Sequence, residues 1–94
     1  MIGSFKDKRT ERFYLGGAVK DYRRFEEAAE TRLARLDAAE SLADLAKVPG
    51  NHLELLLGDR KGFHSIRINR QWRICFRWNE KGKRAEEVEI VDYH

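Results

Sequence analysis

The chain has 94 residues, of which 41% are hydrophobic and 37% charged, with a formal net charge of +3. This length predicts one domain, residues 1–94, and the apolar content excludes an intrinsically disordered chain. A single cysteine excludes a disulfide framework, and no apolar run approaches the roughly 18 to 20 residues that span a bilayer. Because the chain starts without a signal peptide, we expect a cytoplasmic protein with no membrane partner.

The first half of the chain predicts helices. Ser4 and Asp7 have the spacing of a helix start, and Gly16–Gly17 ends the basic segment that follows. A stronger helix is predicted over about four turns by an apolar stripe at spacings of three and four: Tyr22, Phe25, Ala29, Leu33 and Leu36. Ser41 is placed to cap a short further helix, which ends at Pro49–Gly50.

The second half predicts strands in series, at residues 52–57, 63–69, 72–78 and 87–93. The first of them reads as a central strand, and the next two form a hairpin around Arg70–Gln71. Residues 1–5 are long enough for an additional edge strand. The predicted fold class is therefore α+β, with amino-terminal helices packed on one face of a small, mostly antiparallel sheet of four or five strands. The other face is expected to be open.

Positive charge is concentrated in two of these strands and their turns. Residues 60–84 hold nine Lys or Arg and one acid, Glu80, a local balance of +8. Strand alternation separates the aromatic and aliphatic side chains from the arginines at positions 67, 73 and 77. A planar guanidinium binds two phosphate oxygens at once, so this pattern favours a surface that meets phosphate.

Acidic residues leave alternatives open for that surface. The arginines can pair with Glu87 or Glu89 across the strands, which would make a solvated ionic face instead of a phosphate site. Glu54 interrupts a run of leucines. Its carboxylate either points to solvent, pairs with Arg67 or Arg73, or serves as a base.

The chain closes on Asp92, Tyr93 and His94, three groups that can move or position protons. The alternative is a frayed tail with no chemical role. If the tail is ordered, we expect it to turn so that Tyr93 and His94 both reach the arginines. Arg73 is expected to lie outside the core. No spacing of histidines and cysteine matches a metal-ligand motif, so no metal or other cofactor is expected.

Several segments of the sequence together resemble one toxin family. They are Met1–Ile2 with Ser4–Phe5, Leu36–Ala39, Leu53–Glu54, Gly58–Arg60, Ser65–Asn69, Gln71–Ile74, Phe76 and Val88–His94. In this combination they are similar to the HigB-type ("killer protein") toxins of the RelE/ParE superfamily. The resemblance covers the whole chain.

That resemblance implies a small α+β toxin that enters the ribosomal A site and cleaves mRNA without a metal. It also implies a HigA-like helix-turn-helix antitoxin as partner, with operator DNA bound only through the antitoxin complex. By position, Arg73 matches the arginine that stabilises the transition state, and the family's terminal catalytic group falls on Asp92, Tyr93 and His94. Glu54 stands where many members carry histidine, and it joins the expected catalytic set. The expected RNA-binding residues are Arg60, Lys61, Arg67, Arg70 and Arg77.

Two other functions remain open at this stage. One is a superfamily toxin with another target such as gyrase, although that branch generally lacks an ending like Tyr93–His94. The other is a weakly active or non-catalytic member that acts mainly as a partner in the antitoxin and operator complex. Leu57 favours this last reading, because many relatives carry a phosphate-binding lysine there.

Overall fold

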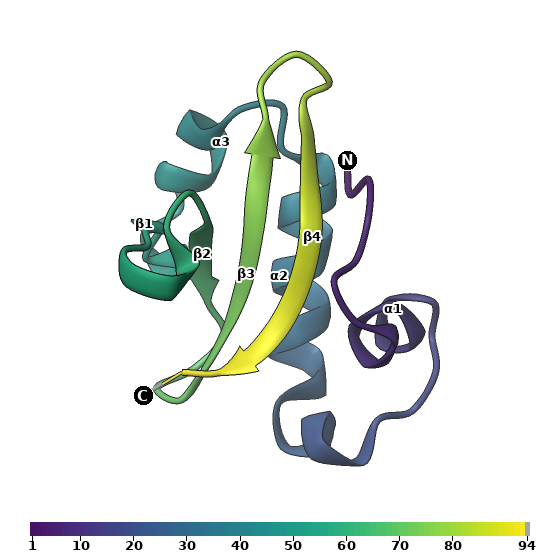
Figure 1. The fold of residues 1–94 in the computed structure, drawn as a ribbon. Helices are drawn as coiled ribbons and strands as arrows, with labels where there is room; N and C mark the ends of the chain where they lie inside the picture. The colour runs from purple at the N-terminus through teal and green to yellow at the C-terminus, as the bar shows by residue number, and fades with distance from the viewer. Residues whose placement is uncertain (94) are drawn as a thin grey trace.

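The computed structural model describes residues 1–93, in which helices precede a four-stranded antiparallel sheet (Figure 1). The α-helices are α1 (Lys8–Tyr14), α2 (Glu26–Ala38) and α3 (Leu42–Ala46). Short 3₁₀ helices are η1 (Lys20–Phe25), η2 (Pro49–Asn51) and η3 (Gly58–Arg60). The strands are β1 (Glu54–Leu55), β2 (His64–Arg67), β3 (Trp72–Asn79) and β4 (Arg84–Asp92), and they pair in the order β1-β2-β3-β4. The α+β class predicted from the sequence is confirmed.

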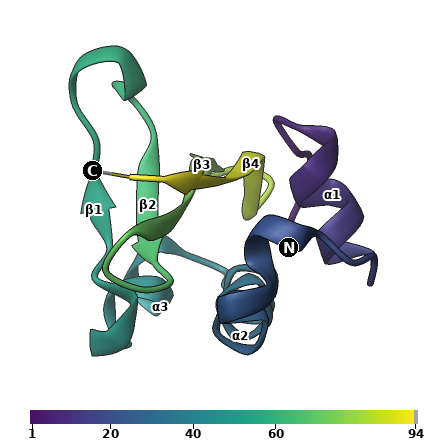
Figure 2. The same cartoon turned by 90° about the horizontal axis from the view of Figure 1, so that it is seen from below.

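The main core lies between the helices and one face of this sheet. Leu33 and Leu36 of α2 are buried in one cluster with Ile66, Ile74 and Ile90 of the strands. Figure 2 shows α2 on one side of β3 and β4, while the connection between β1 and β2 rises on the other side. Burial of each such side chain contributes about 1.5–3 kcal/mol, so this cluster fixes which face of the sheet the helices cover.

The long predicted helix begins later than the apolar stripe suggested. The chain forms the 3₁₀ helix η1 first, and α2 starts only at Glu26. Side chains three residues apart are eclipsed in a 3₁₀ helix, which brings Tyr22 and Phe25 to the same side. Both rings pack on Trp72, with centroid distances of 5.8 and 5.1 Å. The two rings of η1 therefore anchor this segment to the start of β3.

The capping prediction is confirmed at α3 and wrong at α1. α1 starts after Asp7, whose side chain makes no capping hydrogen bond, and the Ser4 hydroxyl donates to Glu86 instead. Gly16–Gly17 follows α1, as the sequence indicated. The Ser41 hydroxyl accepts a hydrogen bond of 3.2 Å from the backbone N–H of Asp44 and so caps α3. In the hairpin between β2 and β3, the Asn69 side-chain oxygen accepts from the backbone N–H groups of Gln71 and Trp72, which closes the predicted turn.

The prediction of a central strand at residues 52–57 is wrong. β1 contains two residues, both exposed, and it pairs only with β2, at the edge of the sheet. Among the neighbouring leucines, Leu56 is buried whereas Leu57 is 80% exposed. An apolar run therefore does not become a central strand here, because its leucines separate: Leu53 packs against the main core and Leu56 is buried elsewhere, whereas Leu55 and Leu57 are exposed. The amino-terminal segment forms two isolated parallel bridges to β4, at Ile2 and Phe5, instead of a full strand.

A β-bulge interrupts the pairing of β3 with β4. Cys75 stands opposite Glu89 and Arg77 opposite Glu86, so two residues of β4 face one residue of β3. Glu87 takes up the extra length with φ of 53°. Bulges increase the local twist of a strand pair. Within residues 1–93, no helix is long and apolar enough to cross a membrane.

Candidate active site

The sheet face that points away from the helices carries a small second cluster of apolar side chains. Leu56 and Phe63 come from the connection between β1 and β2, and they pack with Cys75 of β3 and Val91 of β4. The expectation of a wholly open face is therefore wrong, because this connection folds back over the middle of the sheet. Burial raises the pKa of the Cys75 thiol, so at neutral pH it stays protonated and unreactive.

Arg73 lies on the same face, where it is buried and hydrogen-bonded. The residue is 9% exposed. Its Nε donates a hydrogen bond of 2.7 Å to the Ser65 hydroxyl, and its Nη2 donates one of 2.7 Å to the backbone carbonyl of His52. The expectation that Arg73 lies outside the core is thus wrong: these two acceptors replace water around the guanidinium and allow its burial.

Two further predicted residues lie beside Arg73. The Glu54 carboxylate is 3.6 Å from Nη2 of Arg73, and the Glu54 side chain is 55% exposed. The guanidinium carbon of Arg73 is 5.9 Å from the ring centroid of Tyr93. A hydrogen bond of 2.7 Å from the Tyr93 N–H to the Gln71 carbonyl holds this part of the tail against the β2–β3 turn. The structure therefore brings together Glu54, Arg73 and Tyr93 of the five expected catalytic residues.

Asp92 is placed differently from Tyr93. It stands opposite Trp72, whereas Arg73 stands opposite Val91, and directly opposed residues share a face. Asp92 therefore belongs to the Trp72 side, where its carboxylate accepts a hydrogen bond of 2.9 Å from the Gln71 side chain. Our expectation for His94 lies outside the described residues.

Two of the expected RNA-binding arginines take part in ion pairs. Arg77 is 2.9 Å from Glu87, and its guanidinium stacks 4.4 Å above the Phe63 ring. Arg60 is 3.3 Å from Glu89. The alternative of cross-strand ionic pairing is confirmed for Arg77. Glu89 also pairs with an arginine, but one from the connection that covers the sheet.

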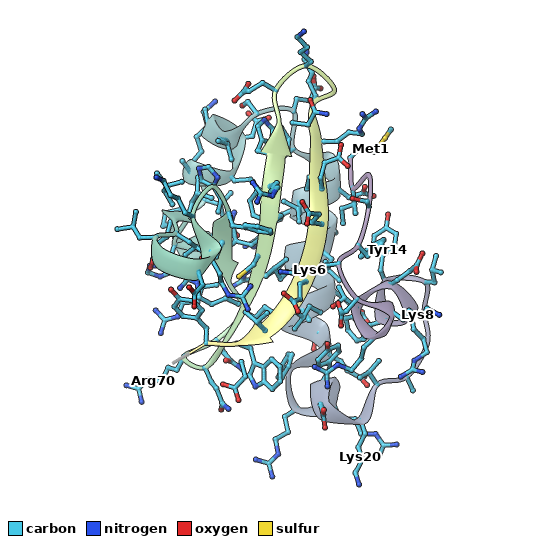
Figure 3. All side chains as sticks on the ribbon, viewed as in Figure 1. Met1, Lys6, Lys8, Tyr14, Lys20 and Arg70 are labelled. Carbon is cyan, nitrogen blue, oxygen red and sulfur yellow. The ribbon has the colours of Figure 1, made fainter. Side chains whose placement is uncertain are left out.

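The other expected RNA-binding residues surround this face. Arg67 stands opposite Arg73, and its Nε donates to the carbonyl of Asn69 at 3.1 Å. Lys61 is exposed in the turn after η3. Arg70 is exposed at the tip of the β2–β3 hairpin and points away from the body of the molecule (Figure 3).

Comparison with known proteins decides the family. Residues 3–94 match the family model of the RelE-like toxin of the type II toxin–antitoxin system HigB. The chain belongs to this HigB family. It is 44% identical over 82 residues to Toxin HigB-1 of Vibrio cholerae, a match that covers 83% of this chain and 84% of that protein. The resemblance recognised in the sequence is thereby confirmed.

One further protein is similar in sequence, and one solved structure is similar in fold. An uncharacterized protein of Haemophilus influenzae is 33% identical over 76 residues, covering 79% of this HigB-family chain and 75% of that protein. A solved YoeB–YefM complex from Staphylococcus aureus contains a chain with the same fold, with a TM-score of 0.61 and 15% identity. That match covers 100% of this chain and 98% of the other. The RelE-like fold is therefore shown for this toxin.

Sequence reasoning missed three residues around the site of this HigB-family toxin. Ser65 and the His52 carbonyl hold Arg73, and Lys6 places its amine 5.1 Å from the centroid of the Phe63 ring. Figure 3 shows Lys6 lying over β4, which the parallel bridge at Phe5 explains. Alternation pointed to Ser65, but no sequence signal indicated a parallel bridge or a backbone acceptor.

The arrangement suits an anion better than a metal ion. Among residues 1–93, no group of three or more His, Cys, Asp or Glu side chains is placed to hold a metal. Arg73 provides a fixed positive charge, Glu54 a carboxylate at the edge of that charge, and Tyr93 a half-exposed phenol above it. These groups can bind a phosphate and exchange protons with it.

Proposed function

We propose that this HigB-family toxin is a metal-independent endoribonuclease that cleaves mRNA in the ribosomal A site and so inhibits translation and growth. The observation that carries the proposal is the placement of Arg73. Its guanidinium is held by two acceptors and lies next to a carboxylate and a phenol. A fixed cation of this kind contributes most where negative charge develops during a reaction.

RNA supplies its own nucleophile, the ribose 2′-hydroxyl. Its oxygen bonds to phosphorus while its proton passes to a base; the bond from phosphorus to the 5′-oxygen breaks, and that oxygen takes up a proton. The products are a 2′,3′-cyclic phosphate and a 5′-hydroxyl. No metal enters this balance, because Arg73 neutralises the extra charge on the phosphorane.

The proton-transfer roles fall to the residues beside Arg73. The Glu54 side chain is exposed and its contact with the guanidinium is long, so a phosphate can displace it from Arg73. The Glu54 carboxylate then lies beside the phosphate and can accept the 2′-hydroxyl proton. Tyr93 is the candidate acid for the leaving oxygen, because its ring lies over Arg73. Asp92 and His94 are retained in the proposed catalytic group from their position in the sequence.

The RNA backbone is proposed to run along the rim of this face. Lys61, Arg67 and Arg70 offer exposed or partly exposed cations, and Lys6 adds one from the amino-terminal segment. Arg77 would exchange its carboxylate partner for a phosphate at little cost, because exposed ion pairs contribute only about 0–1 kcal/mol. Arg60 forms a partly buried pair with Glu89, so we expect it to exchange less readily. Several weak, salt-dependent contacts then hold the strand in place.

The proposed partner outside the ribosome is a HigA-like helix-turn-helix antitoxin, with operator DNA bound only through that complex. Membership of a toxin–antitoxin family supports this, and the structural relative of the same fold was solved in a complex. Because the proposed target is ribosome-bound mRNA, we place the toxin in the cytoplasm.

Cleavage on purified translating ribosomes tests the proposal. The chain is mixed with initiated ribosomes and a defined mRNA, and primer extension maps the breaks. We expect breaks at the A-site codon only when ribosomes are present, with 2′,3′-cyclic phosphate ends. Breaks in naked mRNA, or hydrolytic 3′-hydroxyl ends, would contradict the proposed mechanism.

A second candidate is a weakly active member that serves mainly as antitoxin partner. The specific observation in its favour is Leu57, an 80% exposed leucine beside β1. The same experiment separates the two functions, because this candidate predicts intact mRNA together with tight antitoxin binding.

A further inference from the structure

Ser65 occupies the centre of β2 and is completely buried, with an exposure of 0%. It stands opposite Glu54 on β1 and Cys75 on β3, so all three belong to the face that carries Arg73. Its hydroxyl accepts the Nε–H of Arg73 at 2.7 Å. A buried hydroxyl inside a sheet requires a partner, and this one has a charged partner.

The second acceptor for Arg73 comes from a braced loop. His52 ends η2 in a left-handed conformation, with φ of 45°, and its carbonyl accepts from Nη2 of Arg73. The buried Asn51 side chain ties this loop down: it donates to the Leu45 carbonyl at 3.0 Å and accepts from Arg35 of α2 at 3.1 Å. This acceptor is therefore fixed by α2 and α3.

The two acceptors use one edge of the guanidinium. Nε–H and one Nη2–H point in parallel, so acceptors on both fix the plane of the group as well as its position. Within the described residues, the Nη1 group donates no hydrogen bond. These two hydrogen bonds therefore hold the Nε–Nη2 edge of the guanidinium.

We propose that Ser65 is a positioning residue, whose hydroxyl fixes the plane of the Arg73 guanidinium and so aims its remaining donors at the scissile phosphate. This inference rests on the proposed role of Arg73 in RNA cleavage. Of the two acceptors, only Ser65 is a side chain, so it can be removed by substitution. Without the Ser65 hydroxyl, the guanidinium keeps its charge but can rotate about its remaining hydrogen bond, which it donates to the His52 carbonyl.

A merely structural role for Ser65 is the alternative, and a matched control separates it. Ser65→Ala removes the hydroxyl with little change in volume. Ser41→Ala also removes a hydroxyl that accepts one hydrogen bond, but at the cap of α3. Both substitutions are expected to lower stability. Only the first should alter Arg73.

The direct readout is the side-chain Nε–H signal of Arg73 in a nitrogen-15 NMR spectrum of the free protein. We expect slow exchange with solvent in the wild type and exchange faster by about tenfold or more in Ser65→Ala, because a hydrogen bond to a charged group is lost. Ser41→Ala should leave this signal unchanged. Exchange that is the same in Ser65→Ala and the wild type would overturn the proposal.

The second readout is mRNA cleavage on ribosomes. We expect Ser65→Ala to lower kcat by about ten- to a hundredfold while apparent KM stays within about twofold, since the charge that attracts RNA remains. Ser65→Thr keeps the hydroxyl and should recover most of kcat. An equal loss of kcat in Ser41→Ala would overturn the proposal. A wild-type chain that leaves mRNA intact would overturn the proposed function instead, and the exchange measurement would then decide the role of Ser65 by itself.

Discussion

Arg73 and Arg77 project from the same face of β3, four residues apart, yet their surroundings differ. The Arg73 side chain is 10% exposed and donates to a buried hydroxyl and a backbone carbonyl. The Arg77 side chain is 49% exposed, lies on the Phe63 ring and pairs with a half-exposed glutamate. The Arg73 guanidinium is fixed by buried acceptors, whereas the Arg77 guanidinium pairs with a carboxylate that solvent can replace.

This difference suggests a division of labour. A preorganised cation needs no rearrangement when charge develops on a phosphate, so it lowers the barrier of a reaction. An exposed, exchangeable cation contributes mainly to attraction and binding, and salt weakens that contribution. We therefore propose that Arg73 acts in the chemical step and Arg77 in RNA binding.

Replacing Arg73 by alanine should have the largest effect. We expect cleavage on ribosomes to fall by about 10²- to 10³-fold. Stability should fall too, by about 1–3 kcal/mol in urea unfolding, because Ser65 and the His52 carbonyl lose their donor. Arg77→Ala is the matched control and should change stability by less than about 0.5 kcal/mol. Equal stabilities for the two variants would show that the burial of Arg73 contributes nothing to the fold.

Substitution of Tyr93, whose ring lies over Arg73, should have the next largest effect. Tyr93→Phe keeps the ring over the guanidinium and removes only the phenol. We expect a loss of cleavage of about 10²-fold if that phenol supplies a proton, with unfolding midpoints unchanged. Tyr93→Ala removes the ring as well and serves as the comparison. Full activity of Tyr93→Phe would take the phenol out of the mechanism and leave a stacking role.

The sequence predicted the face on which these groups lie but not their depth. Alternation alone separated Arg73 and Arg77 from the aliphatic side chains, and the structure agrees. What alternation cannot show is which loops and tail residues fold over a strand, so the burial of Arg73 beside the His52 carbonyl and Tyr93 was not predicted. The left-handed turn at His52, which supplies a carbonyl to Arg73, also has no signature in its side chain.

The tail shows a similar limit. We expected the tail to turn so that Tyr93 and His94 both reach the arginines, and no separate position was predicted for Asp92. The register with Trp72 places Asp92 on the side opposite Arg73. The sequence grouped the terminal residues by their proton chemistry and their adjacency, which do not determine the face on which each side chain lies. In the helices, patterning located the apolar stripe but not its 3₁₀ start, because the contacts of Tyr22 and Phe25 with Trp72 are tertiary.

Arg77→Ala should have a smaller effect than Arg73→Ala, and it should affect RNA binding instead of the chemical step. We expect weaker RNA-dependent binding and a salt dependence whose slope falls by about one, with kcat at saturation nearly unchanged. Lys6→Ala should behave in the same way. Lys20→Ala is the control, because it removes an equal charge from η1, away from that surface (Figure 3). A large fall of kcat in Arg77→Ala would remove the distinction between the two arginines.

The smallest expected effect concerns pH, since both arginines stay charged throughout the neutral range. Burial lowers the pKa of His64. In the unfolded chain this histidine titrates at about 6.5, so the unfolded chain binds a proton more readily than the folded chain does. Stability should therefore be lost as pH falls below that value. His64→Gln should flatten the change in urea midpoint between pH 7.5 and about 5.5, a window above the carboxylate titrations. An unchanged slope would assign the pH dependence to other groups.

The most direct test of the central claim compares Arg73→Lys with Arg77→Lys in single-turnover cleavage on saturating ribosomes. Both variants keep the charge, but lysine cannot satisfy two acceptors along one edge as the planar guanidinium does. We predict a fall of about 10²-fold or more for Arg73→Lys and less than about threefold for Arg77→Lys. Equal rates for the two variants would contradict the account, because charge alone would then be sufficient at both positions.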